Sequence, residues 1–340
     1  MHYPLVFKKI VFGYFCIGLI FFSCKSAKDL YFSHPYEKLM TLPGPEDMVL
    51  DTLNSQQRII IACASRRSSE TFQAGLQIYD ISHNVVETLP IVGLPDSIQF
   101  NPHGIDVGIF QGKKILWIIN HEDDKKRQSI LRFWVGDREF TYDTVFCNKN
   151  IISPNDICDG GKGTFYFTND ASSRNSGMEL LFKIKGGSIV YYNGQDFEVY
   201  KKKFAYPNGI IKHKNQLFFS TSRQNKIFSI QLSSSGSMLN DSLSLVTKGM
   251  MWDNFSVNGD HLICTSHTNP LKFLKHRTHA KHDSPCQVYS INPVTKTKGI
   301  VYHSNGESIS AGSTAIYYQG HLYICQVFDP FILKVNLANF

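Results

Sequence analysis

Pairs of adjacent polar residues recur along this chain, each at the start of a short strand-like run. They stand in "PEDMVL", "PNDICD", "PNGIIK" and "WDNFSV" and supply five oxygen donors: Glu46, Asn155, Asn208, Asp253 and Asn254. Two carboxylates and three amides are hard oxygen ligands without sulfur. Such a set suits Ca²⁺, which takes roughly six to eight oxygens in flexible geometry, whereas zinc favours histidine and cysteine. If these side chains converge, we expect a calcium centre.

Two histidines fall among these donors. His103 stands in "NPHGIDV" and His121 ends the apolar run "WIINH". Histidine titrates near neutral pH and is the usual general base, although a lone loop histidine is more often a polar surface residue. Because both belong to one repeat of the chain, we expect them beside the metal.

The elements that position these residues form a repeat. Past residue 40 the chain has short β-rich runs broken by Gly, Asn, Asp and Ser, with almost no helical periodicity. A polar pair, a short strand, a turn and a strongly apolar strand recur at intervals of 46 to 58 residues, from Glu46, His103, Asn155, Asn208, Asn254 and Gly312. Repeats of this size are typical of β-propellers. We predict an all-β fold, a six-bladed β-propeller over residues 25–340; an irregular β-sandwich would not explain one pair per interval.

Equivalent positions on the inner strands of a propeller converge on the central channel, which would bring the five donors together. Neighbouring side chains on a strand point to opposite sides. In Glu46-Asp47 and Asn155-Asp156 the second carboxylate can therefore serve a different site from the first donor. The sequence thus suggests two metal sites. For any one pair, a turn-forming role is the better interpretation, but not for four pairs at matching places.

The composition describes a globular protein. The chain has 340 residues, 42% of them hydrophobic and 19% charged, which argues against a disordered protein. Its net charge of +7 is spread widely, well short of the basic patch of a nucleic-acid-binding protein. We expect a small-molecule partner and no nucleic acid.

The N-terminus resembles a targeting segment. Lys8 and Lys9 precede a short apolar run, 10–22, which is followed by Ser23-Cys24. A basic region, a short apolar region and a small residue are typical of a secretory signal, and the run is short for a spanning helix of roughly 20 residues. Residues 1–24 are interpreted as a cleaved signal, a bacterial lipoprotein signal with lipidated Cys24, or an uncleaved membrane anchor. Each places the rest of the chain outside the cytosol.

The remaining cysteines show no CxxC pair, which argues against a zinc ribbon or thioredoxin-like chemistry. They are scattered: Cys63, Cys147, Cys158, Cys264, Cys286 and Cys325. Several lie in apolar runs, where a small buried side chain is expected. Spacing alone assigns no disulfide.

The motifs "GPED", "FNPHGI", "IINH", "PNDI", "FYFTND", "NGI", "DNFSV" and "GSTA", in this order from about residue 40, resemble the serum paraoxonase/arylesterase family. The resemblance implies a six-bladed propeller with two stacked calcium ions that hydrolyses lactones, aryl esters and, promiscuously, organophosphates. It implies that the catalytic calcium is bound by Glu46, Asn155, Asn208, Asp253 and Asn254. The structural calcium would be bound by Asp47, the main-chain carbonyl of Ile105, and Asp156.

The resemblance also assigns roles to residues that bind no metal. His103 and His121 match the family's dyad, with His103 as proton acceptor. Asp170 in "TND" matches an acid that orients nearby groups, and His267 in "TSHTN" matches a histidine that lines the substrate pocket.

The sequence departs from the family in three places. Ala171 replaces a histidine of the site wall, and the stretch "ILKVNL", with Lys334, lacks the C-terminal cysteine of the family's disulfide. The segment 269–285 is unusually basic where the pocket rim should lie, so substrate preference does not transfer. Its three histidines, His276, His279 and His282, are expected to be solvated.

We therefore expect a calcium-dependent hydrolase of carboxylic esters, most of all lactones. Ca²⁺ would polarise the carbonyl, and His103, supported by His121, would deprotonate the attacking water. Asp253 is a rival general base or nucleophile. The alternatives are a gluconolactonase-like sugar lactonase and a calcium-stabilised propeller that only binds partners. No GxSxG motif supports a serine hydrolase.

Overall fold

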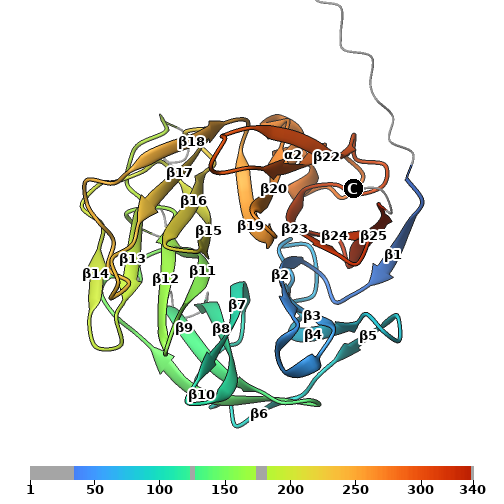
Figure 1. Cartoon of the computed structure of the whole chain (residues 1–340). Coiled ribbons are helices and arrows are strands. Elements are labelled where there is room, and N and C mark those ends of the chain that lie inside the picture. The colour runs from blue at the N-terminus through green and yellow to red at the C-terminus, as the bar shows by residue number, and fades with distance from the viewer. Residues whose placement is uncertain (1–33, 123–126, 174–181, 338–340) are drawn as a thin grey trace, which may run out of the picture. The chain divides into compact units, whose positions relative to one another are not determined.

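The computed structural model describes residues 34–122, 127–173 and 182–337. Their strands form six sheets in a ring around a central channel (Figure 1). In five of the blades four antiparallel strands follow one another outward in sequence order, as in a meander, and in the last blade the N-terminal strand takes the outermost place. The predicted six-bladed propeller is thereby confirmed.

Each polar pair of the sequence begins the innermost strand of its blade. These strands are β2 (Pro45–Asp51), β7 (Pro102–Phe110), β11 (Pro154–Gly161), β15 (Pro207–His213), β19 (Trp252–Asn258) and β23 (Gly312–Tyr318). The apolar runs that follow are the second strands: β3 (Arg58–Ala64), β8 (Lys113–Glu122), β12 (Thr164–Asn169), β16 (Gln216–Thr221), β20 (His261–His267) and β24 (His321–Gln326).

Two further strands complete each blade. The third strands are β4 (Ala74–Asp80), β9 (Arg127–Val135), β13 (Ser188–Tyr192), β17 (Lys226–Gln231), β21 (Cys286–Ile291) and β25 (Phe331–Asn336). The outer strands are β5 (Val85–Thr88), β10 (Phe140–Phe146), β14 (Phe197–Val199), β18 (Ser244–Lys248), β22 (Lys298–Ser304) and β1 (Tyr36–Met40). The second blade adds β6 (Ile91–Val92), parallel to β10. A single 3₁₀ turn, η1 (Leu53–Ser55), links β2 to β3.

The ring closes by strand pairing rather than by a disulfide. The N-terminal β1 is the outer strand of the last blade, where Tyr36 pairs with Val335 and Met40 with Phe331. The six cysteines of the described residues are all free thiols. Backbone hydrogen bonds between the two ends of the propeller therefore replace the missing covalent bond.

The hydrophobic core is divided into wedges between neighbouring blades. In β3, Ile59 and Ile61 pack toward the last blade, whereas Ile60 and Ala62 pack toward the second blade. Successive side chains of a strand point to opposite faces, and here both faces are covered. This is why the second strands are continuous apolar runs instead of alternating ones.

A register shift interrupts each innermost strand at its polar pair. The shifts fall at Pro45/Asp47, Pro102/Ile105, Pro154/Ile157, Pro207/Ile210, Trp252/Phe255 and Gly312/Ala315. A bulge bends its strand and re-aims the side chains. Proline begins four of these strands, a position where its missing N–H is tolerated. The repeat thus places the polar pairs at one end of the channel.

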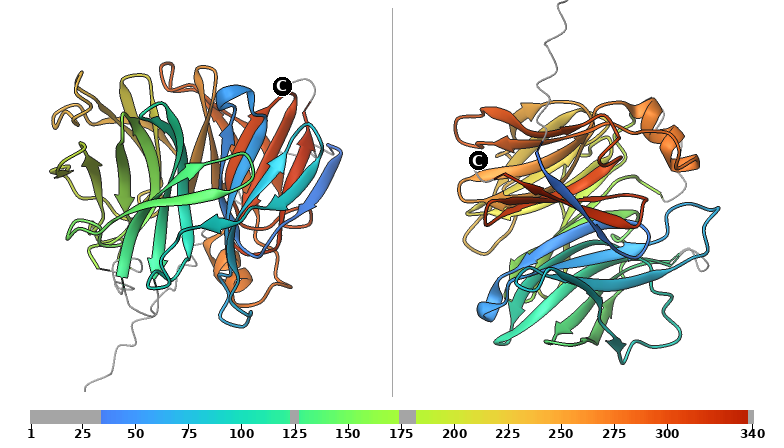
Figure 2. Two further views of the ribbon diagram at one scale, coloured as in Figure 1. Left: turned by 90° about the horizontal axis from the view of Figure 1, so that it is seen from below. Right: turned by 90° about the vertical axis from the view of Figure 1, so that its right-hand side faces the viewer.

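A helix, α2 (Pro270–Thr278), projects from one face of the ring (Figure 2). Its N-cap is Asn269, whose side chain accepts a hydrogen bond from the backbone N–H of Lys272 at 3.0 Å. The sequence showed almost no helical periodicity and did not predict this helix, because only one narrow face of it is covered.

The targeting segment predicted over residues 1–24, with Cys24, lies outside the described residues. Among the residues that the structure does describe, no helix is long and apolar enough to cross a membrane.

Candidate active site

The five predicted donors lie together at one end of the channel. Four of them line a cavity of about 460 Å³, and the fifth, Asn254, donates from Nδ2 to Glu46 Oε1 at 3.4 Å. All five side chains are buried, although they come from the first, third, fourth and fifth blades. The bulges turn them inward from equivalent strand starts.

The free oxygens of this group fit a cation. Within the described residues, Glu46 Oε2 and the amide oxygens of Asn155, Asn208 and Asn254 are buried and have no hydrogen-bond partner. Buried acceptors are normally paired, because leaving one unpaired costs free energy. Four unpaired acceptors in one cluster indicate a positively charged occupant with oxygen preference, as Ca²⁺ has.

The electrostatics point the same way. Burial raises the pKa of Glu46 well above its usual range, and the nearby charges of Asp47 and Asp253 raise it further. Those carboxylates repel one another because they are buried close together. A bound cation would relieve the repulsion. The described residues hold no cluster of three His, Cys, Asp or Glu side chains able to bind a metal, because three of the five donors are asparagines.

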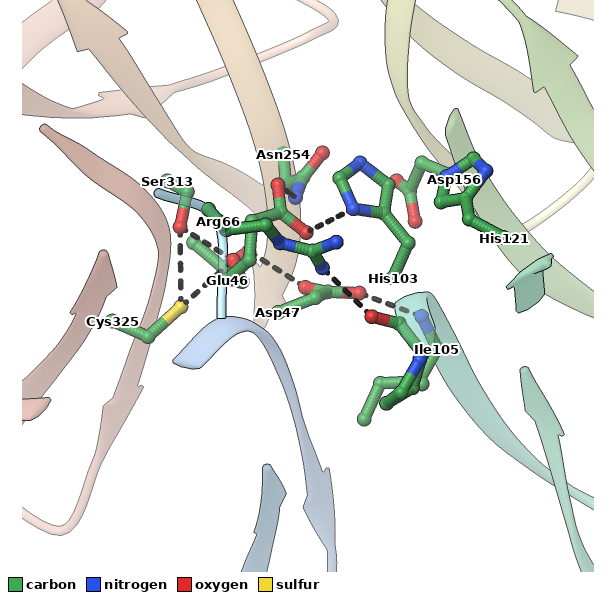
Figure 3. Close-up of polar contacts among 12 residues, drawn as sticks. Glu46, Asp47, Arg66, His103, Ile105, His121, Asp156, Asn254, Ser313 and Cys325 are labelled. Atoms are coloured by element: carbon green, nitrogen blue, oxygen red, sulfur yellow. Dashed lines mark hydrogen bonds and ion pairs between the residues drawn. The ribbon is translucent and has the colours of Figure 1, made fainter. Parts of the chain in front are cut away.

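His103 and His121 lie beside these donors, as Figure 3 shows. The Nδ1 atom of His103 is 3.5 Å from Glu46 Oε2, and the two imidazole rings meet edge to face with centroids 4.9 Å apart. Nδ1 of His121 also contacts Oε1 of Gln128. Burial, then Arg66, then His121 lower the pKa of His103 well below its usual value. A neutral His103 can accept a proton.

A second carboxylate–histidine pair lies in the same cavity. Nε2 of His267 is 2.7 Å from Asp253 Oδ2, and both side chains are buried. Sequence reasoning named the two residues separately, as a ligand and a pocket residue, and missed that they form a pair. Only their spacing of fourteen residues across the hairpin of β19 and β20 hinted at it.

Asp170 lies one layer behind the cavity. Its Oδ1 accepts a hydrogen bond from Ser153 Oγ at 2.6 Å, and its charge is the first cause that raises the pKa of Tyr206, a cavity residue, well above the usual value. Asp170 therefore contacts the wall of the cavity through Tyr206.

The residues predicted for a second metal lie farther along the channel. Asp47, Ile105 and Asp156 line a separate cavity of about 230 Å³. Asp47 Oδ2 accepts from the backbone N–H of Ile105 at 2.7 Å, and Asp156 Oδ2 accepts from that of Ile210 at 2.7 Å. Burial raises the pKa of Asp47 to about 7, and raises that of Asp156, with the charge of Asp47 as the next cause.

Two glycines allow the inner strands to approach this closely. A Cβ atom at Gly104 would lie 2.7 Å from the carbonyl oxygen of Asn155, and one at Gly209 would lie 2.5 Å from that of Asp253. Any side chain at either position would push a donor-bearing strand away. The "HGI" and "NGI" motifs are thereby explained by packing against the neighbouring blade.

Sequence reasoning missed Arg66, which lies beneath the site. Its Nη2 donates to the carbonyl oxygen of Pro102 at 2.7 Å, and burial lowers its pKa while Glu46 opposes that effect. Nothing in "SRRSSE" distinguishes Arg66 from a surface arginine. The rim residues Tyr206, Arg223 and Met251 were missed as well.

The expectation for the basic segment was right about its place and wrong about one histidine. Helix α2 does lie at the cavity rim, but His276 is buried, not solvated, with 1% of its surface exposed. Its Nδ1 is 2.6 Å from the carbonyl oxygen of His282, and its ring packs against Phe328. Large aromatic residues such as Phe133 and Trp252 pack in the core.

Known proteins resemble this chain. The sequence model of the family described as Arylesterase matches residues 60–333. Human serum paraoxonase/lactonase 3 is 27% identical over 71% of this chain and 70% of its own length. Rat serum paraoxonase/arylesterase 1 is 25% identical over 72% and 71%. A calcium-binding protein, regucalcin, from Agrobacterium tumefaciens has a similar fold, with a TM-score of 0.57 and 10% identity over 88% of this chain and 91% of that one.

Proposed function

This chain belongs to the arylesterase family, and from that premise we propose that it is a calcium-dependent hydrolase of carboxylic esters with lactones as its main substrates. The family and the named relatives support an esterase or lactonase that acts on small molecules. The observation that carries the finer proposal is the cluster of unpaired, buried oxygens beside a histidine of lowered pKa, in a cavity large enough for a small ester.

The proposed residues for the first calcium ion are Glu46, Asn155, Asn208, Asp253 and Asn254. Those for the second ion are Asp47, the carbonyl of Ile105, and Asp156. When bound at the first site, Ca²⁺ supplies positive charge that polarises an ester carbonyl and stabilises the negative charge that develops on its oxygen. The donor chemistry of hard oxygens supports calcium rather than zinc.

His103 is the proposed general base. Neutral at pH 7 because its pKa is lowered, it accepts a proton from the water that attacks the carbonyl carbon. His121 restricts the orientation of the His103 ring by packing against it at 4.9 Å. The ring nitrogen then returns the proton to the departing alkoxide, which completes the hydrolysis.

Asp253 is the rival base, with a specific observation in its favour. The Oδ2 atom of Asp253 is 2.7 Å from Nε2 of His267, a histidine other than the His103 and His121 pair. His267 would then orient the carboxylate, much as a base is oriented by a third group in other hydrolases. Asp170 acts more remotely, through Tyr206, as a positioning residue.

Two broader properties belong to the same proposal. The relatives named paraoxonase support a promiscuous organophosphatase activity, since a site that stabilises negative charge on a carbonyl oxygen can do the same for a phosphoryl oxygen. The N-terminal sequence and the relatives' designation as serum proteins support an extracytoplasmic location, either secreted or anchored to a membrane by residues 1–24.

The experiment that tests the proposal is hydrolysis of γ- and δ-lactones and phenyl acetate by protein lacking residues 1–24, with calcium and with EGTA. We expect turnover that disappears on chelation and returns with added calcium. A folded, calcium-loaded protein without turnover would contradict the proposal and favour a propeller that only binds partners.

A further inference from the structure

One wall of the active-site cavity is built by a single face of α2. Four residues of the helix line the cavity: Pro270, Phe273, Leu274 and Arg277. Their spacing of three, four and seven residues places them on the same face of a helix. The first three are apolar, and the fourth is a cation in the last turn. The wall therefore changes from apolar to positive along the helix.

The helix is held firmly where that cation projects. His276, the residue before Arg277, is buried, and its carbonyl oxygen accepts a hydrogen bond from Arg67 Nε at 3.3 Å. Arg67 Nη1 is in turn 2.8 Å from Asp329 Oδ1. Phe273 packs against the His267 ring with centroids 4.5 Å apart. These contacts fix the backbone of α2 against the propeller. The Cα atom of Arg277 is therefore held in place at the rim of the cavity.

The Arg277 guanidinium makes no ion pair and no hydrogen bond with any residue in the described part of the chain. Other arginines of the fold are paired: Arg132 with Asp143 at 2.5 Å, and Arg58 with Asp51 at 2.9 Å. Arg277 is exposed, so its charge is hydrated and available. A guanidinium of this kind can exchange its hydrating water for a ligand anion at a small cost in free energy.

The Arg277 guanidinium lines the cavity together with the phenol of Tyr206 and with Arg223. The lining also includes two carboxylates, Glu46 and Asp253, and Asp253 Oδ2 is 2.7 Å from His267 Nε2.

The helix segment that carries Arg277 is basic. Residues 269–282 include Lys272, Lys275, Arg277 and Lys281 and contain no acidic residue. An anion approaching this rim meets positive potential, which favours its binding and raises its association rate.

We propose that the substrate carries a carboxylate, remote from its scissile carbonyl, and that Arg277 binds this carboxylate at the rim. The proposal rests on the hydrolase function argued above and names its substrate class: an anionic lactone or ester. A guanidinium binds a carboxylate through two parallel hydrogen bonds. Phe273 and Leu274, one turn earlier on the same face, contact the carbon skeleton between the carboxylate and the reacting ester.

The test compares two γ-lactones of the same shape, 4-(5-oxotetrahydrofuran-2-yl)butanoate and its carboxamide, as substrates of the calcium-loaded full chain. We expect the wild type to prefer the carboxylate in kcat/KM by about tenfold or more. Arg277→Gln should reduce that preference by about tenfold, mainly through KM, and Arg277→Lys should restore part of it. Lys275→Gln, the same loss of charge on the same helix but off the cavity lining, should change it by less than about twofold.

Two results would overturn the inference, and they differ. The first is hydrolysis of both lactones without preference, or an equal change of the preference in Arg277→Gln and Lys275→Gln. Arg277 would then not be the site that binds a substrate carboxylate, while the proposed hydrolase function would stand. If neither lactone nor phenyl acetate is hydrolysed by the folded, calcium-loaded protein, the proposed function fails and the substrate class fails with it.

Discussion

The two cavities of the channel use the same polar pairs in different ways. At the wider one, the first members of the pairs present unpaired buried oxygens, among them Glu46 Oε2 and Asn155 Oδ1. At the narrower one, the second members Asp47 and Asp156 have both carboxylate oxygens hydrogen-bonded to backbone N–H groups. Adjacent residues of one strand therefore differ in hydrogen bonding: the first has a buried oxygen without a hydrogen-bond partner in the described part of the chain, and the second has a carboxylate with both oxygens bonded.

The difference teaches how one repeat can serve both chemistry and stability. Asp47 accepts from its own blade and from the next, and Asp156 does the same, so these carboxylates join neighbouring blades. The free oxygens of Glu46 and the asparagines accept no hydrogen bond from the described residues, although His103 Nδ1 lies 3.5 Å from Glu46 Oε2, and they leave room for a cation and a substrate. We therefore expect substitutions at the wide cavity to reduce turnover and substitutions at the narrow cavity to reduce stability.

The largest effect is expected from His103→Gln. Loss of a general base lowers kcat by roughly a hundredfold to ten-thousandfold, while calcium affinity should stay the same because no proposed ligand is altered. Lactone hydrolysis and calcium titration of the same preparation check this. His83→Gln, at an exposed loop, is the control. Wild-type turnover in the His103 variant would exclude His103 as the base and favour Asp253.

Glu46→Gln should follow, with turnover lower by roughly a hundredfold to a thousandfold, because a negative ligand of the cation is lost. The same change removes a buried, repelled carboxylate, so the calcium-free protein should be no less stable. Thermal unfolding with and without calcium checks this: the rise in Tm on adding calcium should shrink. Glu37→Gln, on exposed β1, should change neither quantity. An unchanged calcium response would remove Glu46 from the ligand set.

Asp156→Asn tests the narrow cavity. The amide nitrogen cannot accept a hydrogen bond, so the buried N–H of Ile157 or of Ile210 loses its partner. We expect the free energy of unfolding to fall by about 1–3 kcal/mol, measured by urea unfolding at saturating calcium, and turnover of the folded protein to fall far less than in His103→Gln. If the Asp156 variant were as inactive as His103→Gln but fully stable, the narrow cavity would serve turnover rather than stability, contrary to our expectation.

The smallest effect is expected from Thr314→Val. The Thr314 hydroxyl donates to Asp47 Oδ1 at 2.6 Å, and both side chains are buried. Loss of that hydrogen bond should cost about 1 kcal/mol of unfolding free energy, without loss of turnover. Thr314→Ser keeps the hydroxyl and should behave like the wild type; equal losses in the two variants would assign the effect to packing instead.

The fold was predictable because its information is local and repeated. Each blade begins with a polar pair and continues in an apolar strand, and six copies define a propeller. Closure was not predictable: the sequence showed that the family's cysteine was missing, but the pairing of β1 with β25 joins residues almost 300 positions apart. Helix α2 was missed because only one narrow face of it is covered: His276 is buried, whereas Leu271 and Leu274 are exposed.

The sequence by itself determined which residues could bind a cation, since the types and the repeat of Glu46, Asn155, Asn208, Asp253 and Asn254 require no knowledge of contacts. Only the tertiary structure decided which of their oxygens stay unpaired, that His267 bonds Asp253, and that His276 is buried while Arg277 faces the cavity. Those properties depend on strands brought together across the ring: Glu46 and Asn254 meet across 208 residues of chain. Partners at such distances leave no trace in local residue spacing, because burial and hydrogen bonding arise only when the blades pack.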